Sequence, residues 1–420
     1  MIKSIIRKEI LNNLLSYKFS IITILSTILI LVSILVMYGD YCLALENYEF
    51  LQSKSGESVG VLRPTPLSIF AKGLEDNLCR YRQGSGGSIS VAAKQKSVNN
   101  LFKLFTTPDL LYVVKIILSL CAMLFAFDMV SGEKEAGTLR QSLSNSLGRP
   151  ILIMGKWIGG FTSFILPFVM AVLLGTIYVT LSPKVDMNQE NSLKLGLFLL
   201  NSMIYLAVFF SLGLLISCLT HRSSTSLVVS LFVWATLVFL VPNMGNILAR
   251  QLVSIPTSAQ IELKRQQLSF KNQIEARNEN RAERMTWEEQ KTSARLRIKR
   301  SRLLETQIQE DYRNRFNKLV ALSQDITRFS PAATFTFLAT DLMGTGLLEE
   351  RRLRRSVEQH MSIPESKSEE KSGESAFSYQ RSSVKEVLSL GGLNNCLVLI
   401  LFAMLFFTGA YLAFLRYDIR

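Results

Sequence analysis

The sequence predicts an all-α integral membrane protein with six transmembrane helices and a large, mainly helical extracytoplasmic insertion. Two observations lead to this fold class. Of the 420 residues, 48% are hydrophobic and the mean hydropathy is +0.25, which leaves too little polar surface for a soluble domain. The apolar residues also lie in blocks of about 20, the length that crosses a ~30 Å hydrocarbon core as a helix.

The apolar blocks set the expected spans. Residues 1–18 alternate basic and apolar side chains at helical spacing, which is typical of an amphipathic interfacial helix. The block at 19–38 follows directly and is too long for the apolar region of a cleavable signal, so we expect it to be the first span. The other spans are expected at 110–130, 151–181, 195–219, 226–241 and 393–415.

Basic residues in the short loops predict the orientation. Eleven Lys and Arg residues lie on the side that holds residues 1–18, the 131–156 segment, Arg222 and the C-terminal Arg416 and Arg420, against two in the opposite loop at 182–194. The termini are therefore expected in the cytoplasm, with the chain in the cytoplasmic membrane of a prokaryote. The 39–109 segment and the 243–389 insertion would then be extracytoplasmic. The insertion is itself rich in Arg and Lys, but long loops translocate largely regardless of charge.

Within the insertion, residues 257–328 are expected to form a long helical hairpin. Their charged residues greatly outnumber the apolar ones, so they cannot bury a globular core. A narrow apolar stripe can still pair two helices or recruit a partner. The competing interpretation is a cytoplasmic coiled coil, which would invert the topology.

The sequence offers no site for chemistry on this chain. The segment from Gly148 to Trp157 departs from a P-loop in both spacing and final residue, and the two histidines lie far apart. We therefore predict no enzyme activity, no metal site and no cofactor bound by this chain. The net charge of +14 does not indicate nucleic acid, because many basic residues flank spans, where they meet membrane lipid.

Three further residues leave alternatives open. Asp128 is the one acid inside the apolar blocks, and it has either an interfacial or structural role or a place in a substrate path. Cys42 and Cys79 share one polar segment that is expected outside the cytoplasm. An oxidising compartment would favour a disulfide between them, and the alternative is two unpaired, shielded thiols.

The 131–150 loop carries the most informative pattern. Gly132-Glu133-Lys134-Glu135-Ala136-Gly137-Thr138-Leu139 is followed by Arg149 and by Gly155-Lys156. This run resembles the first cytoplasmic loop of ABC type-2 exporter permeases, where it forms a coupling helix that docks on the ATPase. The resemblance implies an ATPase-coupling role for Glu133, Glu135, Gly137, Thr138 and Leu139.

A weaker resemblance concerns one branch of these permeases, labelled as multicopper-enzyme or nitrous oxide reductase maturation permeases. Residues 63–74 and 330–346 look like segments of that branch. The chain has no Cys, His and Met cluster for copper, so the label does not name a substrate.

The resemblance leads to a functional hypothesis. The chain would be an exporter permease that pairs with a second copy or a paralogue, while ATP and Mg²⁺ bind to separate ABC ATPase subunits. The alternative is a non-transporting membrane assembly whose ATPase drives an extracytoplasmic partner protein. A membrane enzyme is the third and least supported class, and the sequence names no substrate.

Overall fold

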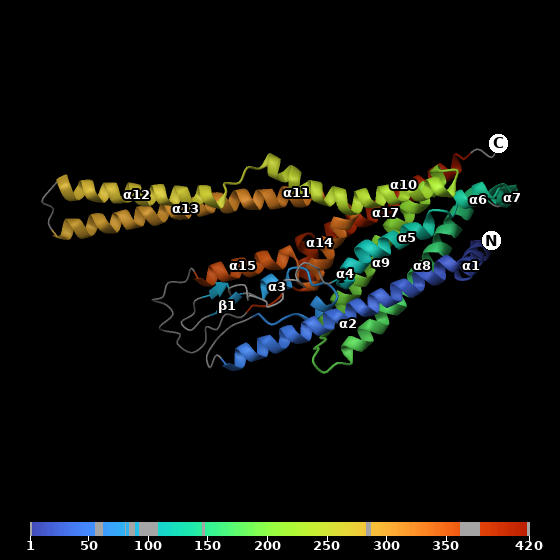
Figure 1. Cartoon of the computed structure of the whole chain (residues 1–420), viewed down its shortest axis with the longest axis horizontal. Coiled ribbons are helices and arrows are strands. Elements are labelled where there is room, and N and C mark those ends of the chain that lie inside the picture. Colours follow the sequence, from blue (N-terminus) through green and yellow to red (C-terminus); the bar gives the residue numbers. More distant parts are fainter. Residues whose placement is uncertain are drawn as a thin grey trace. The chain divides into compact units, whose positions relative to one another are not determined.

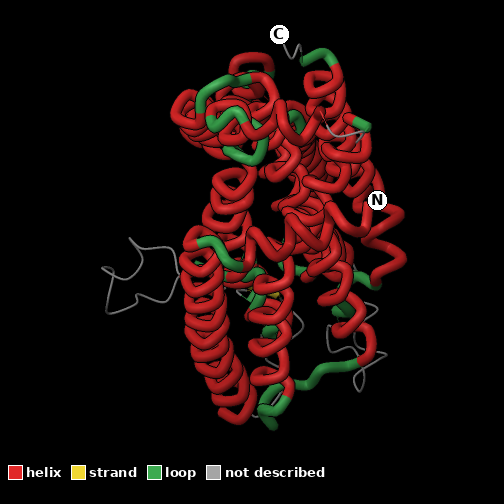
Figure 2. The backbone as a smooth tube through the Cα atoms, turned by 90° about the vertical axis from the view of Figure 1, so that its right-hand side faces the viewer, coloured by secondary structure: helices red, strands yellow, loops and turns green. Residues whose placement is uncertain are grey.

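A computed structural model describes residues 2–54, 62–79, 81–83, 89–91, 108–144, 148–282, 287–361 and 379–417. The chain divides into two compact units, one of Met1–Phe239 with Ser330–Arg420 and one of Leu240–Phe329. Almost all described residues are helical (Figure 2), which confirms the all-α fold class. Apart from turns and loops, the non-helical part of the described residues is a three-residue antiparallel ladder between β1 (Tyr81–Gln83) and β2 (Ile89–Val91).

The first unit contains most of the helices labelled in Figure 1. Its π-helical turns η2, η3 and η6 each continue directly into an α-helix. The helices are α1 (Ile2–Leu14), α2 (Tyr17–Lys54), η1 (Pro66–Ile69), α3 (Glu75–Leu78), α4 (Leu110–Tyr112), η2 (Val113–Leu118), α5 (Ser119–Ala126), α6 (Ser131–Glu135), α7 (Thr138–Ser144), α8 (Arg149–Thr180), α9 (Gln189–Leu219), α10 (Ser223–Ala235), α14 (Pro331–Met343), α15 (Leu347–Met361), α16 (Val384–Val387), η6 (Leu388–Gly392) and α17 (Leu393–Leu415). The turn η3 (Thr236–Leu240) lies at the boundary between the two units.

Six helical stretches in the described part of the chain are long and apolar enough to cross a membrane. The first is longer than the apolar block that predicted it, because no proline lies between Tyr38 and Lys54 and α2 continues to Lys54. The chain is therefore a multi-pass membrane protein. The six stretches are Tyr17–Phe50, Leu110–Glu135, Arg149–Thr180, Gln189–Leu219, Ser223–Leu252 and Val384–Leu415.

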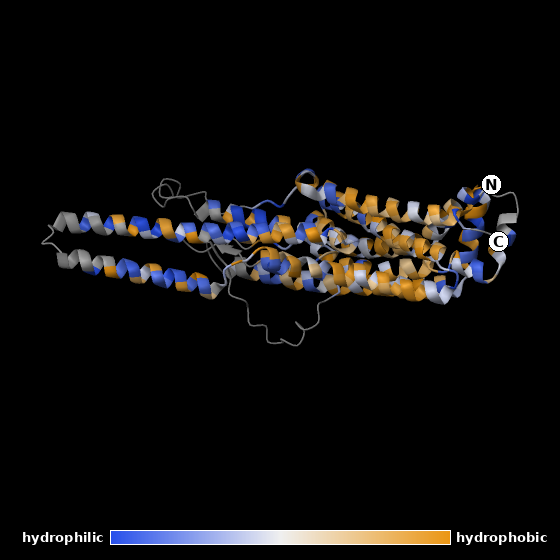
Figure 3. Ribbon diagram, turned by 90° about the horizontal axis from the view of Figure 1, so that it is seen from above, coloured by the Kyte–Doolittle hydropathy of each residue, from blue (hydrophilic) through white to orange (hydrophobic). Residues whose placement is uncertain are grey.

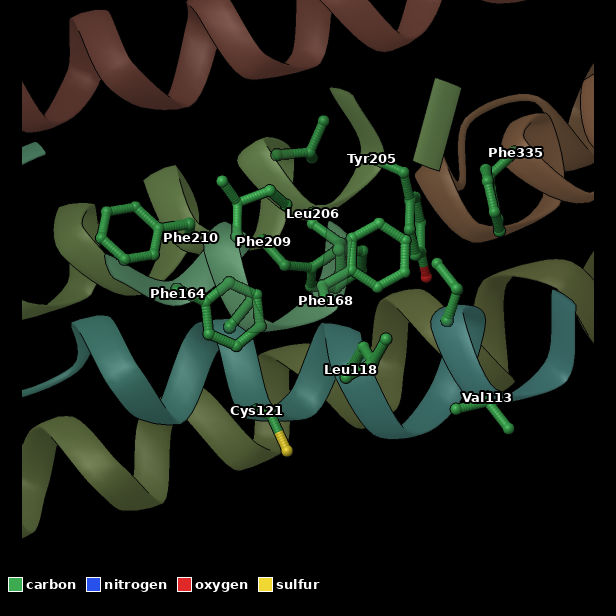
Figure 4. Close-up of a cluster of buried hydrophobic side chains, with 14 of the residues drawn as sticks. Val113, Leu118, Cys121, Phe164, Phe168, Tyr205, Leu206, Phe209, Phe210 and Phe335 are labelled. Atoms are coloured by element: carbon green, nitrogen blue, oxygen red, sulfur yellow. The ribbon is translucent and has the colours of Figure 1, made fainter. Parts of the chain in front are cut away.

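The core of the first unit is built around α9, the most buried of these stretches. Aromatic side chains from several helices pack on it (Figure 4). Tyr205 of α9 stacks on Phe335 of α14, with ring centroids 4.3 Å apart and planes inclined by 12°. Burial of such rings adds to the packing of the many aliphatic side chains of this unit.

The expected 243–389 insertion falls into two parts in the structure, and the second part begins with α14. With 13 residues, α14 is too short to cross a bilayer, but it buries Phe335, Leu338 and Leu342 and packs on α9 and α17. The chain from Ser330 onward therefore belongs to the unit that holds five of the spans, not to a separate insertion domain. The physical reason is composition, since α14 is apolar whereas the preceding helix is highly charged.

The second unit consists of α11 (Val241–Leu252), α12 (Ser258–Ala282) and α13 (Trp287–Thr327). Polar and charged residues dominate α12 and α13, in contrast to the apolar span helices (Figure 3). The two long helices touch through sparse contacts, among them a hydrogen bond of 3.0 Å from Asn272 Nδ2 to Ser301 Oγ. Residues 283–286, between the two helices, lie outside the described part of the chain.

Candidate functional site

The candidate coupling segment consists of two short helices, α6 and α7. The second membrane-spanning stretch, Leu110–Glu135, ends with α6, and α7 lies between that stretch and the third. Gly137 separates them with a φ of +70°, and a β carbon there would meet nothing within 4 Å. Glycine is therefore favoured by the left-handed backbone and not by lack of space. Residues 145–147, also in the predicted 131–150 loop, lie outside the described residues.

The start of α6 is fixed to the C-terminal end of α9. Ser217 Oγ accepts hydrogen bonds from the backbone N–H groups of Val130 and Ser131, at 3.0 and 2.9 Å. Lys134 Nζ donates to the carbonyl oxygens of Cys218 and Thr220, at 2.5 and 3.1 Å. These carbonyls have no partner within the helix, so the lysine caps α9 and its charge complements the helix dipole.

Glu135 makes the corresponding contact with the next helix. Its Oε2 accepts a hydrogen bond of 3.0 Å from the backbone N–H of Ser223, the first residue of α10. A carboxylate at a helix N-terminus satisfies a free donor and complements the dipole. Lys134 and Glu135 therefore hold α6 to both sides of the α9–α10 turn.

Glu133 points in a different direction, toward a buried lysine on α8. Lys156 has only 3% of its side chain exposed, and its Nζ lies 2.8 Å from Glu133 Oε1 and 3.1 Å from Glu9 Oε1. Each carboxylate comes from a different helix, α6 for Glu133 and α1 for Glu9. The buried ammonium thus joins the N-terminal helix and α6 to the third span.

Two glycines of α8 bring α1 close enough for this contact. A β carbon at Gly155 would lie 2.6 Å from Ile5 Cγ2, and one at Gly159 would lie 2.8 Å from Glu9 Cβ. Small residues four apart on one helix face allow close approach of a second helix. This close packing places Glu9 beside Lys156.

Only a few residues of the α6–α7 segment are exposed. Glu135, Ala136, Gly137, Thr138 and Arg140 are exposed, whereas Leu139 is buried in the main apolar cluster. Of the five residues that the sequence predicted for coupling, Gly137 and Thr138 offer free surface. Glu133 and Glu135 are engaged within the chain, and Leu139 anchors α7.

Sequence reasoning missed the roles of Lys156, Glu9 and Ser217. Lys156 was visible as part of the Gly155-Lys156 pair before the third span, but nothing in its local pattern named its partners. Asp128 forms an ion pair with Lys18, whose ammonium group also lies 5.0 Å from the centroid of the Phe127 ring. This pairing matches the interfacial or structural alternative for Asp128.

The two candidate disulfide cysteines are free thiols in the structure. Cys42 packs against the main apolar cluster, whereas Cys79 Sγ donates to Glu75 Oε1 at 3.7 Å. Burial, with a further contribution from the Glu75 charge, raises the pKa of the Cys79 thiol far above its usual range. This arrangement corresponds to the alternative of unpaired, shielded thiols.

The two segments of the weaker resemblance, 63–74 and 330–346, lie against each other. The backbone N–H of Leu74 donates to the Thr345 carbonyl at 2.8 Å, and Thr345 Oγ1 donates to the Ala71 carbonyl at 3.0 Å. A β carbon at Gly73 would lie 2.6 Å from the Thr345 carbonyl oxygen, so this contact needs glycine.

A largely buried arginine, with 17% of its side chain exposed, completes the junction. Arg381 donates to Glu75 at 2.7 Å and to the carbonyls of Gly344 and Arg63. Burial disfavours its charge, but the Glu75 carboxylate outweighs that cost and raises the pKa of Arg381. The described side chains include no group of three or more metal-ligating residues here or elsewhere.

The fold and site together define a class, that of helical membrane proteins with a short, anchored helix pair where the second span leads into the third. The sequence model of one family, described as ABC-2 family transporter protein, matches residues 3–419. The chain belongs to this family, which makes it a permease component of an ABC system that implies an ABC ATPase partner. No curated protein matched the sequence.

Proposed function

We propose that the chain is the membrane-spanning subunit of an ABC exporter, paired with a second copy or a paralogue. Two separate ATPase subunits would hold ATP and Mg²⁺ and dock on the α6–α7 segment. The observation that supports this most directly is the combination of anchoring and exposure. The segment is held to α1, α8, α9 and α10 by the contacts above, yet residues 135–138 and 140 remain exposed.

This combination suits the transmission of force. A docked ATPase that moves the exposed face would carry α6 with it as a rigid body. Lys134 and Glu135 pass that displacement to the α9–α10 turn, and the Glu133–Lys156 pair passes it to α8 and α1. Movement of the spans would then export a substrate from the cytoplasm or extract it from the inner leaflet.

The proposed orientation places both termini and the α6–α7 segment in the cytoplasm. Lys134 and Arg149 lie at this end of the first unit, together with Tyr417, whose ring centroid is 4.7 Å from Lys134 Nζ. Figure 1 shows α1, α6 and α7 at the same end. The basic residues gathered there support a cytoplasmic location.

The test changes exposed residues of the α6–α7 segment and leaves unchanged the residues that hold this segment to the other helices. The double variant Thr138→Arg with Arg140→Glu changes the size of one exposed side chain and the charge of another, and Arg140 forms no ion pair with any described residue. We expect co-purification of the ATPase and its stimulated hydrolysis to fall by about tenfold or more, as for loss of an interface contact. The amount of permease in the membrane should stay unchanged.

The matched control is Lys385→Glu, an exposed charge change on α16, near the N-terminal end of α9. It should retain the ATPase. A double variant that still purifies with a fully stimulated ATPase would remove the docking role from this face.

A further inference from the structure

One stretch of α13 is strongly basic. Between Lys291 and Arg302 the sequence has six Lys or Arg residues and neither Asp nor Glu. Acids lie on both sides of this stretch, the nearest being Glu289 and Glu305. The stretch is therefore a local concentration of positive charge on a helix whose other segments carry both signs.

Three of these cations have no carboxylate partner among the described residues. Arg295, Lys299 and Arg302 are exposed and form no ion pair there. Elsewhere on the hairpin the pattern differs. Arg315 pairs with Asp311 at 3.1 Å, and Arg328 pairs with Asp325 at 2.7 Å.

Apolar side chains lie among the unpaired cations. Ile298 and Leu303 are 55% and 58% exposed, although both are large aliphatic residues. Together with Arg295, Lys299, Arg302 and Thr306 they line a shallow groove of about 270 Å³ along α13. We name these six residues the basic groove. An ordinary solvated helix face would not combine exposed aliphatic side chains with a single sign of charge.

We propose that the basic groove is a docking surface for an acidic amphipathic helix of a partner protein. Carboxylates of such a helix would neutralise Arg295, Lys299 and Arg302, while its apolar stripe would cover Ile298 and Leu303. The residues follow one helix over three turns, which suits an extended rod-shaped partner. A second copy of this chain fits poorly, because it would bring the same positive charge to the surface.

This proposal concerns only the hairpin and does not depend on the proposed export function. The test uses the full-length protein in nanodiscs of neutral phosphatidylcholine. The probe is a fluorescent peptide of about four heptads, with leucine at the a and d positions and glutamate at e and g, so that it does not pair with itself. Binding is measured by fluorescence anisotropy.

Two variants test the charged and the apolar residues of the basic groove separately. Arg295→Glu, Lys299→Glu and Arg302→Glu together reverse the charge, and Ile298→Ser with Leu303→Ser removes the apolar part. We expect each variant to bind the peptide about tenfold more weakly or worse. The matched control is Arg313→Glu, Arg315→Glu and Lys318→Glu, which changes the net charge of the same helix equally and should bind as the wild type. Circular dichroism checks that helix content is retained.

Four outcomes would contradict the proposal. Absence of wild-type binding at about 100 µM peptide, a typical ceiling for a specific contact, would overturn it. Equal binding by the charge-reversal variant would remove the groove as the site. Polyglutamate that binds as tightly as the peptide would indicate charge attraction alone. Phosphatidylglycerol vesicles that bind through the groove while the peptide does not would assign it to an anionic lipid surface.

Discussion

At the scale of single residues, Lys156 is the most consequential side chain of the candidate site. Its ammonium group is removed from water, and only the two carboxylates of Glu9 and Glu133 compensate for the lost hydration. Such a group stabilises the protein only as long as both partners remain. It therefore makes the α1, α6 and α8 contacts depend on one another.

We expect Lys156→Met to lower the stability of the protein by about 3–5 kcal/mol, the usual cost of leaving buried charges without their partner. The measurement is the thermal unfolding midpoint of the purified protein in detergent. Lys385→Met, at an exposed position, is the control and should leave the midpoint nearly unchanged. An unchanged midpoint for Lys156→Met would mean that the carboxylates find other partners.

At the scale of elements, the contact between α1 and α8 shows how one helix face sets the position of another. The glycines at 155 and 159 leave a flat surface on α8, and Ile5 and Glu9 of α1 lie directly over it. The predicted interfacial helix is thus packed on a span and is more than a membrane anchor. Any side chain larger than hydrogen at these glycines must push α1 away.

Gly159→Leu should separate α1 from α8, at a cost of about 1–3 kcal/mol for overpacking. Trypsin, which cleaves after Lys3, Arg7 and Lys8, should then cut α1 faster than in the wild type. Gly196→Leu is the matched control, since a β carbon there meets nothing within 4 Å. Equal cleavage of the two variants would show that α1 does not depend on the glycine surface.

At the scale of the whole molecule, a single orientation in the membrane assigns a side to each aqueous part. The basic residues of the short loops predict that the α6–α7 segment lies in the cytoplasm and the hairpin of α12 and α13 outside it. Both assignments follow from one orientation, so one experiment tests them together.

The orientation is tested with single cysteines in a chain whose five native cysteines are replaced by serine or alanine. Gln267→Cys on α12 should react with a membrane-impermeant maleimide in intact cells, because its position is exposed and predicted outside. Thr138→Cys should react only after permeabilisation. Thr138 is preferred to Gly137, where the φ of +70° would strain any cysteine. The reverse pattern would invert the topology and remove the α6–α7 segment from the compartment of the ATPase.

The sequence by itself determined the fold class and the number of candidate spans, and it singled out the α6–α7 segment as the candidate for coupling. Each of these depends on a local property, because an apolar block of sufficient length must become a helix in lipid, where no water can satisfy its backbone. The glycine between α6 and α7 is local in the same sense, since its backbone needs only the absence of a β carbon.

The tertiary structure decided which side chains of that segment face outward and which are engaged inside. Glu135 pairs with a backbone group 88 residues away, and Lys156 pairs with Glu9 across 147 residues. It also placed α14 against α9 and left Cys42 and Cys79 unbonded. No local pattern encodes these outcomes, because each depends on which distant helices pack together and on the burial that the packing creates.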